Sequence, residues 1–369
     1  MTGSLVGNID VAQVVLYAFW LFFAGLIWYL RQEDRREGYP LEEDVTGRYN
    51  KSPWLFVPPK KTFLLPHGQG IKQVPDFKRD ERTAFTVIAF IGSVFSPYYH
   101  WSGRKTPENH VAFNVALYGP DGHAWAMTER AQRHLHRGKS FLQIGGSSLR
   151  FEGSDFVIAF DEVFLPWPGQ RWLPKRMRGE IRLAPAFLAD QTYLLDAAGR
   201  HAWKPVAPCG RVTVSCDAMK DGGWSGDGYH DMNHGNRPLE EDFKGWDWAR
   251  GTTADGRTVL LYDSVLADGD NRRSGLVYSD RGAVSHFEPP ARRLLKRGFW
   301  GVGGGVGCDE GTTPELLGRF EDTPFYRRSL VETAIAGDRV VMMHETLDCR
   351  RLAMPLVKLM LPFRMPRRG

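Results

Sequence analysis

One apolar run near the start of the chain restricts the possible folds more than any other feature of the sequence. Residues Val11–Leu30 read VAQVVLYAFWLFFAGLIWYL, and Gln13 is the one strongly polar side chain among these 20 residues. A helix rises about 1.5 Å per residue, so this run would reach about 30 Å, the thickness of the hydrocarbon core of a bilayer. We therefore predict a single transmembrane helix over residues 11–30.

The charges on either side of the run predict its orientation. Residues 1–10 contain no Lys or Arg, whereas a cleaved signal peptide would begin with a basic segment. Arg31, Arg35 and Arg36 follow the run, and by the positive-inside rule they keep the main body of the chain in the cytoplasm. We expect a single-pass protein whose amino terminus lies outside the cytoplasm. The predicted membrane-anchoring residues are Trp20, Trp28, Tyr29 and Arg31.

The rest of the chain has the composition of a domain that faces water. The mean hydropathy of the chain is -0.36, and its 40 Gly and 23 Pro favour turns and short strands over long helices. A net charge of +5 suits a surface close to anionic lipid, but it is too small and too dispersed for nucleic-acid binding. We therefore predict a lipid bilayer as a partner and no nucleic acid.

The residues that most often bind metals or phosphates form no recognisable motif. His134 and His136 could share one strand face, but no third ligand stands at a suitable spacing, so we predict no metal site. The segment Gly301–Gly307 fits neither a dinucleotide fingerprint nor a phosphate loop. The cysteines form no CxxC pair, and we expect them to be reduced core residues. They are Cys209, Cys216, Cys308 and Cys349.

Strand-like runs dominate the sequence after a connector. Residues 31–82 should form an extended cytoplasmic-surface connector, because several prolines forbid a continuous helix. From residue 83 onward, short apolar runs alternate with turn signals such as Asp121-Gly122 and Asp268-Gly269. These patterns predict a mainly β protein, with antiparallel sheets closed as barrels.

The end of the chain, Leu347–Pro366, allows two interpretations. It mixes apolar side chains with basic ones, which is typical of an amphipathic tail that contacts a membrane. The preferred interpretation is a final strand buried in the last barrel. Pro355 and Pro362 argue against a long helix in either case.

The first part of the sequence resembles a known membrane subunit. Gly7–Glu42 is similar to the amino-terminal segment of the photosynthetic reaction-centre H subunit of purple bacteria, and Pro59–Gly70 continues the likeness until about Val74. The resemblance implies a periplasmic amino terminus at residues 1–10 and a location in the inner, photosynthetic (intracytoplasmic) membrane. It also implies reaction-centre core and antenna subunits as partners. The aromatic side chains of the helix would then contact either lipid or pigment.

The remainder resembles carotenoid 1,2-hydratase, also called hydroxyneurosporene synthase. This resemblance implies two lipocalin-like β-barrel domains, which we assign to residues 83–218 and 219–369, the second with a basic carboxy-terminal tail. It also implies an acyclic carotenoid as substrate and, because hydration needs neither redox chemistry nor a metal, no cofactor. The segments that carry the likeness are Ala89–Gly119, Asp161–Pro168, Gly228–Arg250, Glu321–Thr333 and Met360–Arg368.

The family motif that pairs His-x-Trp with Tyr-x-Asp occurs in this chain at His201-Ala-Trp203 and Tyr229-His-Asp231. Hydration of a terminal C1=C2 bond requires a proton at C2 and capture of the resulting C1 cation by water. The resemblance implies that Asp231 is the acid, and an apolar pocket would keep its carboxyl group neutral. The rings of Trp203 and Tyr229 would stabilise the cation, while His201 would orient the acid or the water.

Two alternatives stand beside this assignment. The first is structural: Trp203 and Tyr229 would be core residues, and Asp231 would cap a turn. The second concerns the whole protein, which would be a non-catalytic subunit whose hydratase-like domain serves as a cytoplasmic scaffold. It draws support from the segment Ile71–Asp76, where related hydratases carry an aromatic strand of the WWYxDA type and this chain has Lys72, Gln73 and Pro75.

Overall fold

The computed structural model describes residues 4–6, 9–10, 69–74, 83–119, 122–166, 173–217 and 223–368. The predicted transmembrane helix at 11–30, its anchoring residues, and residues 31–68 of the predicted connector lie outside these ranges. None of the helices within them is long and apolar enough to span a bilayer. Strands β1 (Ser4–Val6) and β2 (Ile9–Asp10) pair with each other in one compact unit, and all other described elements belong to a second, Pro53–Arg368.

The first large sheet of this second unit has 13 described strands in the order β24-β6-β5-β4-β3-β14-β13-β11-β10-β9-β8-β7, with β12 paired to β13. Its neighbours are antiparallel, except for the parallel pair β24 and β6. The strands are β3 (Gln69–Val74), β4 (Ala84–Ile91), β5 (Val111–Gly119), β6 (Gly122–Arg130), β7 (Leu135–Arg137), β8 (Phe141–Ile144), β9 (Ser147–Glu152), β10 (Asp155–Phe164), β11 (Lys175–Pro185), β12 (Tyr193–Leu194), β13 (His201–Cys216), β14 (Gly223–Gly235) and β24 (Arg367–Arg368).

The second large sheet has seven strands in the order β18-β17-β16-β15-β23-β22-β21. They are β15 (Phe243–Thr252), β16 (Thr258–Leu266), β17 (Asn271–Tyr278), β18 (Val284–Phe287), β21 (Glu315–Asp322), β22 (Tyr326–Ile335) and β23 (Asp338–Asp348). A separate short ladder joins β19 (Arg292–Leu294) to β20 (Gly305–Gly307). The predicted hairpins at Asp121-Gly122 and Asp268-Gly269 are confirmed, because β5 pairs with β6 and β16 pairs with β17.

Short helices complete the described structure, and those at the carboxy terminus correct the sequence analysis. Cys349–Ala353 and Pro355–Met360 are helical, so the preferred prediction of a final buried strand is wrong for this segment. Pro355 begins the second helix, where its missing N–H costs nothing, and thereby separates it from the first. The helices are α2 (Pro97–Trp101), η1 (Pro107–Asn109), η2 (Gln132–His134), α3 (Leu239–Asp242), α4 (Cys349–Ala353), α5 (Pro355–Met360) and η3 (Leu361–Phe363).

The first sheet curls around its own apolar core. Buried side chains from β4, β5, β6, β8, β9, β10, β11 and β13 form one cluster on its inner face. The curl brings the end of β10 beside β6, where the Leu165 N–H donates to the Trp125 carbonyl at 3.0 Å. The prediction of an antiparallel, mainly β fold is confirmed. The predicted closed barrels are not observed. In each described sheet the first and last strands are edge strands that are not hydrogen-bonded to each other.

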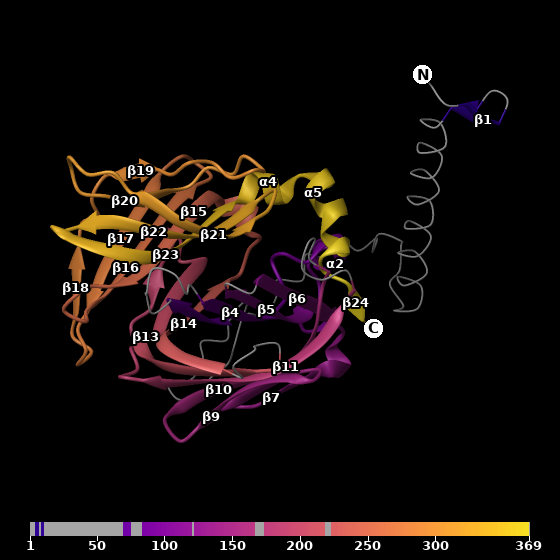
Figure 1. Ribbon diagram of the computed structural model, residues 1–369, viewed down its shortest axis with the longest axis horizontal. Helices are drawn as coiled ribbons and strands as arrows, with labels where there is room; N and C mark the ends of the chain where they lie inside the picture. Colours follow the sequence, from indigo (N-terminus) through magenta and orange to yellow (C-terminus); the bar gives the residue numbers. More distant parts are fainter. Residues whose placement is uncertain are drawn as a thin grey trace. The chain divides into compact units, whose positions relative to one another are not determined.

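The two sheets pack against each other (Figure 1), and aromatic side chains form much of the layer between them. The outer face of β4, β5, β13 and β14 meets one face of β15, β16 and β17. The other face of the second sheet packs against β19 and β20. The change from the first sheet to the second occurs between β14 and β15, whereas the predicted domain boundary at 218 and 219 precedes β14. The division into two domains stays a prediction.

Candidate active site

Strands β13 and β14 bring the two sequence motifs together. They are antiparallel neighbours, and their register places Pro205 opposite Asp231, so Trp203 and Asp231 are diagonal neighbours on one face. The indole Nε1–H of Trp203 donates to Oδ2 of Asp231 at 3.0 Å. The phenol of Tyr229 donates to the same oxygen at 3.2 Å. Three of the four predicted site residues therefore form one hydrogen-bonded cluster.

All three residues of this cluster are buried. Burial raises the pKa of the Tyr229 phenol well above its usual value of 10.0, and the nearby Asp231 charge adds to the shift. Tyr229 therefore stays protonated at neutral pH and acts as a donor. Trp203 and Tyr229 belong to a buried apolar cluster, as the structural alternative predicted. Asp231 lies within β14 and accepts from two ring donors, so the part of that alternative in which it caps a turn is wrong.

The second sheet supplies the opposite wall of the site. The ring of Tyr262 on β16 lies 5.2 Å from that of Trp203, and the ring of Trp248 on β15 lies 5.3 Å from that of Tyr229. Burial, together with the charge of Asp231, raises the pKa of Tyr262 well above its usual value, which places its phenol in the same environment. Asp231 thus meets the polar edges of Trp203 and Tyr229, and the rings of Tyr262 and Trp248 pack against those two rings.

Two further tyrosines extend this aromatic layer. The Tyr193 ring lies 5.5 Å from that of Trp203, and its hydroxyl group is 3.3 Å from the hydroxyl group of Tyr278. Burial raises the pKa of both phenols. These residues enlarge the apolar aromatic surface around the Asp231 cluster.

His201 has a different environment from the other predicted site residues. Its Nε2 lies 2.8 Å from Oδ2 of Asp242, and its ring meets Phe243 edge-on at 4.8 Å. A side chain on Gly235, the residue opposite on β14, would collide with the His201 ring, so only glycine fits there. The ring therefore joins β13 to the start of β15. Its predicted role in orienting the acid or the water stays a prediction.

Strand β3 lies directly beside the candidate site. It pairs with β14 on one side and β4 on the other, so that Gly70 is opposite Asp231 and Lys72 is opposite Tyr229. This is the segment in which the sequence departs from the aromatic strand of related hydratases. The chain nevertheless forms the strand, and the backbone of the sheet is continuous next to Asp231.

A second buried polar cluster lies at the same aromatic layer. Nε of Arg328 donates to Oε1 of Glu345 at 3.0 Å, and the Tyr118 phenol donates to Oε1 of Glu321 at 2.6 Å. Nη1 of Arg328 also donates to the Tyr118 oxygen, at 2.5 Å. Because Tyr118 comes from β5 and its partners come from β21, β22 and β23, the cluster ties the two sheets together.

Sequence reasoning missed the residues of the second sheet at the site. The residues GWDWAR, 245–250, lie within the family segment Gly228–Arg250 and alternate in pattern. Trp246 and Trp248 are two residues apart on β15 and so share one face, which predicts an aromatic surface. No local signal identifies Tyr262 or Asp242 as neighbours of the motif residues.

Comparisons with known proteins bear out both predicted resemblances. The family model for the carotenoid hydratase CrtC matches residues 87–369, and that for the photosynthetic reaction centre, H-chain N-terminal region, matches residues 3–98. Among solved structures, a putative AttH from Nitrosomonas europaea has a TM-score of 0.51 at 11% identity, covering 76% of this chain and 92% of that one. This last likeness concerns the fold alone.

Curated relatives agree with the family models. The acyclic carotenoid 1,2-hydratase of Thiocapsa roseopersicina is 44% identical over 290 residues, which are 77% of this chain and 69% of that protein. The hydratase of the same name from Cereibacter sphaeroides is 39% identical over 282 residues, 76% of this chain and 98% of that protein. These relatives confirm the predicted class of enzyme, a hydratase. The chain belongs to the carotenoid hydratase family and carries before it a segment like the reaction-centre H chain.

Proposed function

We propose that this protein adds water across the terminal C1=C2 bond of an acyclic carotenoid, with Asp231 as the acid. The observation that carries this proposal is the pair of hydrogen bonds from Trp203 and Tyr229 to one oxygen of a buried carboxyl group. The names of the curated relatives support the choice of substrate.

The hydrogen-bond pattern suggests where the proton resides. Both ring donors engage Oδ2 of Asp231, which would be the carbonyl oxygen of the proposed neutral acid. The acidic proton would then reside on Oδ1. Burial among aromatic rings opposes the charged form of the carboxyl group, as general acid catalysis requires.

The reaction then proceeds in two steps. Asp231 transfers its proton to C2, the π electrons of the double bond form the new C–H bond, and a tertiary cation remains at C1. The faces of Trp203, Tyr229 and Tyr262 stabilise this cation. Water forms a bond to C1 and loses a proton to the Asp231 carboxylate, so that the acid is restored and the product is a 1-hydroxy carotenoid. Each step uses side chains and water, so no cofactor is part of the proposal.

Asp231→Asn tests the role of the acid. The amide oxygen can still accept from Trp203 and Tyr229, but the side chain supplies no acidic proton, so we expect a loss of roughly 10³-fold in hydration. The assay is chromatography of 1-hydroxy products from cells that accumulate lycopene or neurosporene. Asp227→Asn, at a half-buried position of the same strand where the side chain pairs with Arg211, is the matched control and should retain activity.

Two results would overturn this proposal. One is a folded Asp231→Asn variant with undiminished hydration. The other is the absence of product from well-folded parent protein; if loss of the same protein also impaired the photosynthetic complex, the alternative of a non-catalytic scaffold would be supported.

We further propose that residues 11–30 anchor the protein in the photosynthetic membrane beside the reaction-centre core and antenna. The match of residues 3–98 to the H-chain family model supports this assignment, as do the length and apolar character of the run. Replacing residues 11–30 with an unrelated apolar helix should keep the protein in the membrane but abolish its co-purification with the reaction centre. Unchanged co-purification would contradict the proposed contact.

A further inference from the structure

Large apolar side chains are exposed together at one end of the unit Pro53–Arg368. Phe299 is 87% exposed, Leu294 77% and Leu356 67%. Two segments carry these residues: 292–300, which includes β19, and 350–363, which includes α4 and α5. We call their combined surface the carboxy-terminal face. Its exposed apolar residues are Leu294, Phe299, Trp300, Met354, Leu356, Leu359, Met360 and Phe363.

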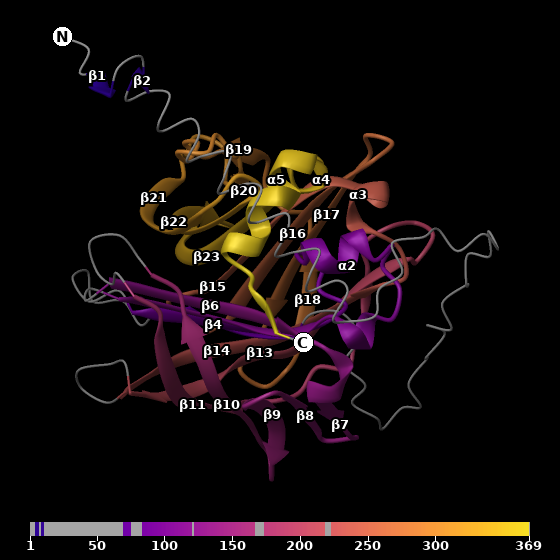
Figure 2. The same ribbon diagram turned by 90° about the vertical axis from the view of Figure 1, so that its right-hand side faces the viewer.

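The two segments of this face are neighbours in space. Nη1 of Arg351, on α4, donates to the Trp300 carbonyl at 2.7 Å and to the Pro324 carbonyl at 3.3 Å. In Figures 1 and 2, β19, β20, α4 and α5 all lie along the upper side of the unit. The end of the first segment, at Phe299 and Trp300, therefore adjoins α4.

The helices of this face are amphipathic. Leu352, Val357 and Leu361 are buried in an apolar cluster against the sheets, and this contact holds the helices in place. The next residues along the same turns, such as Leu356 and Leu359, are exposed. Because the inner face already anchors the helices, the outer apolar side chains are not required for packing within the part of the chain that the structure describes, and their exposure to water is unfavourable.

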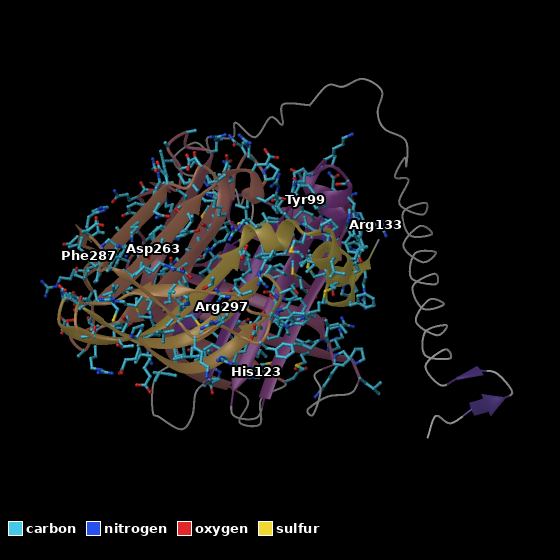
Figure 3. The ribbon with its side chains drawn as sticks, turned by 90° about the horizontal axis from the view of Figure 1, so that it is seen from above. Tyr99, His123, Arg133, Asp263, Phe287 and Arg297 are labelled. Carbon is cyan, nitrogen blue, oxygen red and sulfur yellow. The ribbon has the colours of Figure 1, made fainter. Side chains whose placement is uncertain are left out.

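Basic residues predominate in the two segments of this face, although Asp247, Asp322 and Asp348 contact them. Residues 292–300 contain Arg292, Arg293, Lys296 and Arg297 and no Asp or Glu, and residues 349–368 likewise contain basic residues and no acidic one. Arg292 is paired with Asp247, and Arg350 and Arg351 are paired with Asp348 at 3.9 Å and 3.6 Å. Arg293, Lys296 and Arg297 are exposed. Figure 3 views the unit from this side and labels Arg297. Exposed basic side chains around exposed apolar side chains complement a partner that has both negative charge and an apolar interior.

We propose that the carboxy-terminal face docks on an anionic phospholipid bilayer, with Phe299, Trp300 and Leu356 at the boundary between headgroups and acyl chains. Aromatic and aliphatic tips with a basic rim are the composition that binds this boundary. A side chain as exposed as Phe299 would need a complementary pocket in a protein partner, whereas a fluid bilayer accommodates it without one.

This docking would help catalysis only if the proposed hydration of a carotenoid is correct, so that part of the inference rests on the proposed function. An acyclic carotenoid dissolves in the hydrocarbon core rather than in water. A predicted anchor at 11–30 would hold the chain near the bilayer, and a second contact through the carboxy-terminal face would hold the hydratase unit in one orientation at the lipid surface.

The test uses the full chain in nanodiscs that contain phosphatidylglycerol, with spin labels at Phe299→Cys or Leu356→Cys. Accessibility to oxygen should exceed accessibility to a water-soluble nickel reagent several-fold at both positions. Phe141→Cys on β8, an exposed apolar residue of the other sheet, is the matched control and should remain accessible to the nickel reagent. The parent chain, labelled in parallel, corrects for its own four cysteines.

The outcomes separate this inference from the proposed function, because the measurement involves no carotenoid. Accessibility at positions 299 and 356 equal to that of the control would overturn the docking, whatever the hydratase activity. Magnetic coupling between labels of two copies would also overturn it, since it would show self-association through this face. Conversely, lipid contact in a protein without hydratase activity would leave the docking supported and the proposed function refuted.

Discussion

Two buried carboxyl clusters border the same aromatic layer, and their partners differ. Asp231 accepts hydrogen bonds from Trp203 and Tyr229, which are uncharged donors. Glu345 is paired with the guanidinium of Arg328, which also contacts Glu321 at 3.4 Å. A carboxylate beside a guanidinium is stabilised in its charged form, whereas uncharged donors in an apolar environment allow a carboxyl group to carry a proton. The comparison separates the cluster that we propose for acid catalysis from one that joins the two sheets.

Arg328→Met should have the largest effect on stability. It leaves Glu321 and Glu345 buried without their cation, which costs about 3–5 kcal/mol. Denaturant-induced unfolding measures the loss. Arg319→Met, an exposed position on the same sheet, should change the free energy of unfolding by less than about 0.5 kcal/mol. Equal effects of the two substitutions would show that the buried ion pairs do not hold the sheets together.

His230, on the face of β14 opposite to Asp231, should make the stability of the protein depend on pH. His230 points away from the Asp231 cluster and stacks on Phe156 with ring centroids 4.3 Å apart. Burial lowers the pKa of His230 to about 3. Between pH 6.5 and about 3 the unfolded chain therefore binds a proton that the folded chain does not, so stability falls as the pH falls, by roughly 1.4 kcal/mol per unit.

His230→Gln should remove this contribution. The difference in the free energy of unfolding between parent and variant should change by about 2 kcal/mol between pH 7 and pH 5, because the parent loses the stability of its neutral imidazole. Unfolding curves of both proteins at the two pH values provide the measurement. Parallel pH profiles would mean that His230 is protonated within the fold, contrary to its burial.

Tyr229→Phe should have the smallest of these effects and should act on catalysis. It removes one of the two donors to Asp231 at little cost in packing, so we expect kcat to fall about tenfold and stability to change by about 1 kcal/mol. Tyr278→Phe removes a hydroxyl group that contacts Tyr193 instead, and it should leave kcat nearly unchanged. Equal losses in kcat would show that the donors to Asp231 have no special role.

Much of the fold follows from local patterns. Alternating apolar residues and Asp-Gly turns correctly predicted the strands and two of the hairpins, because the side-chain period and the turn conformation are properties of a few adjacent residues. The carboxy-terminal helices were missed because short amphipathic segments interrupted by Pro355 and Pro362 lack a clear period. Their helical form depends on packing against the sheets through residues such as Leu352.

The candidate site was predictable only in part. Trp203, Tyr229 and Asp231 stand in short motifs on adjacent strands, so sequence could propose them as one group. His201 belongs to the same motif, yet its ring bonds to Asp242, a residue 41 positions away. The aromatic wall from Tyr262 and Trp248 comes from the other sheet and has no signature in either motif.

The sequence by itself determined the strand-rich architecture, the family and the acidic residue at the centre of the candidate site, since these depend on residue types and short spacings. Only the tertiary structure decided which buried carboxyl groups are paired with a cation. Tyr118 and Arg328 are 210 positions apart, and their contact exists only because the two sheets pack face to face. The charge state that a buried group can adopt depends on such distant neighbours, because the low-dielectric interior makes their interactions strong.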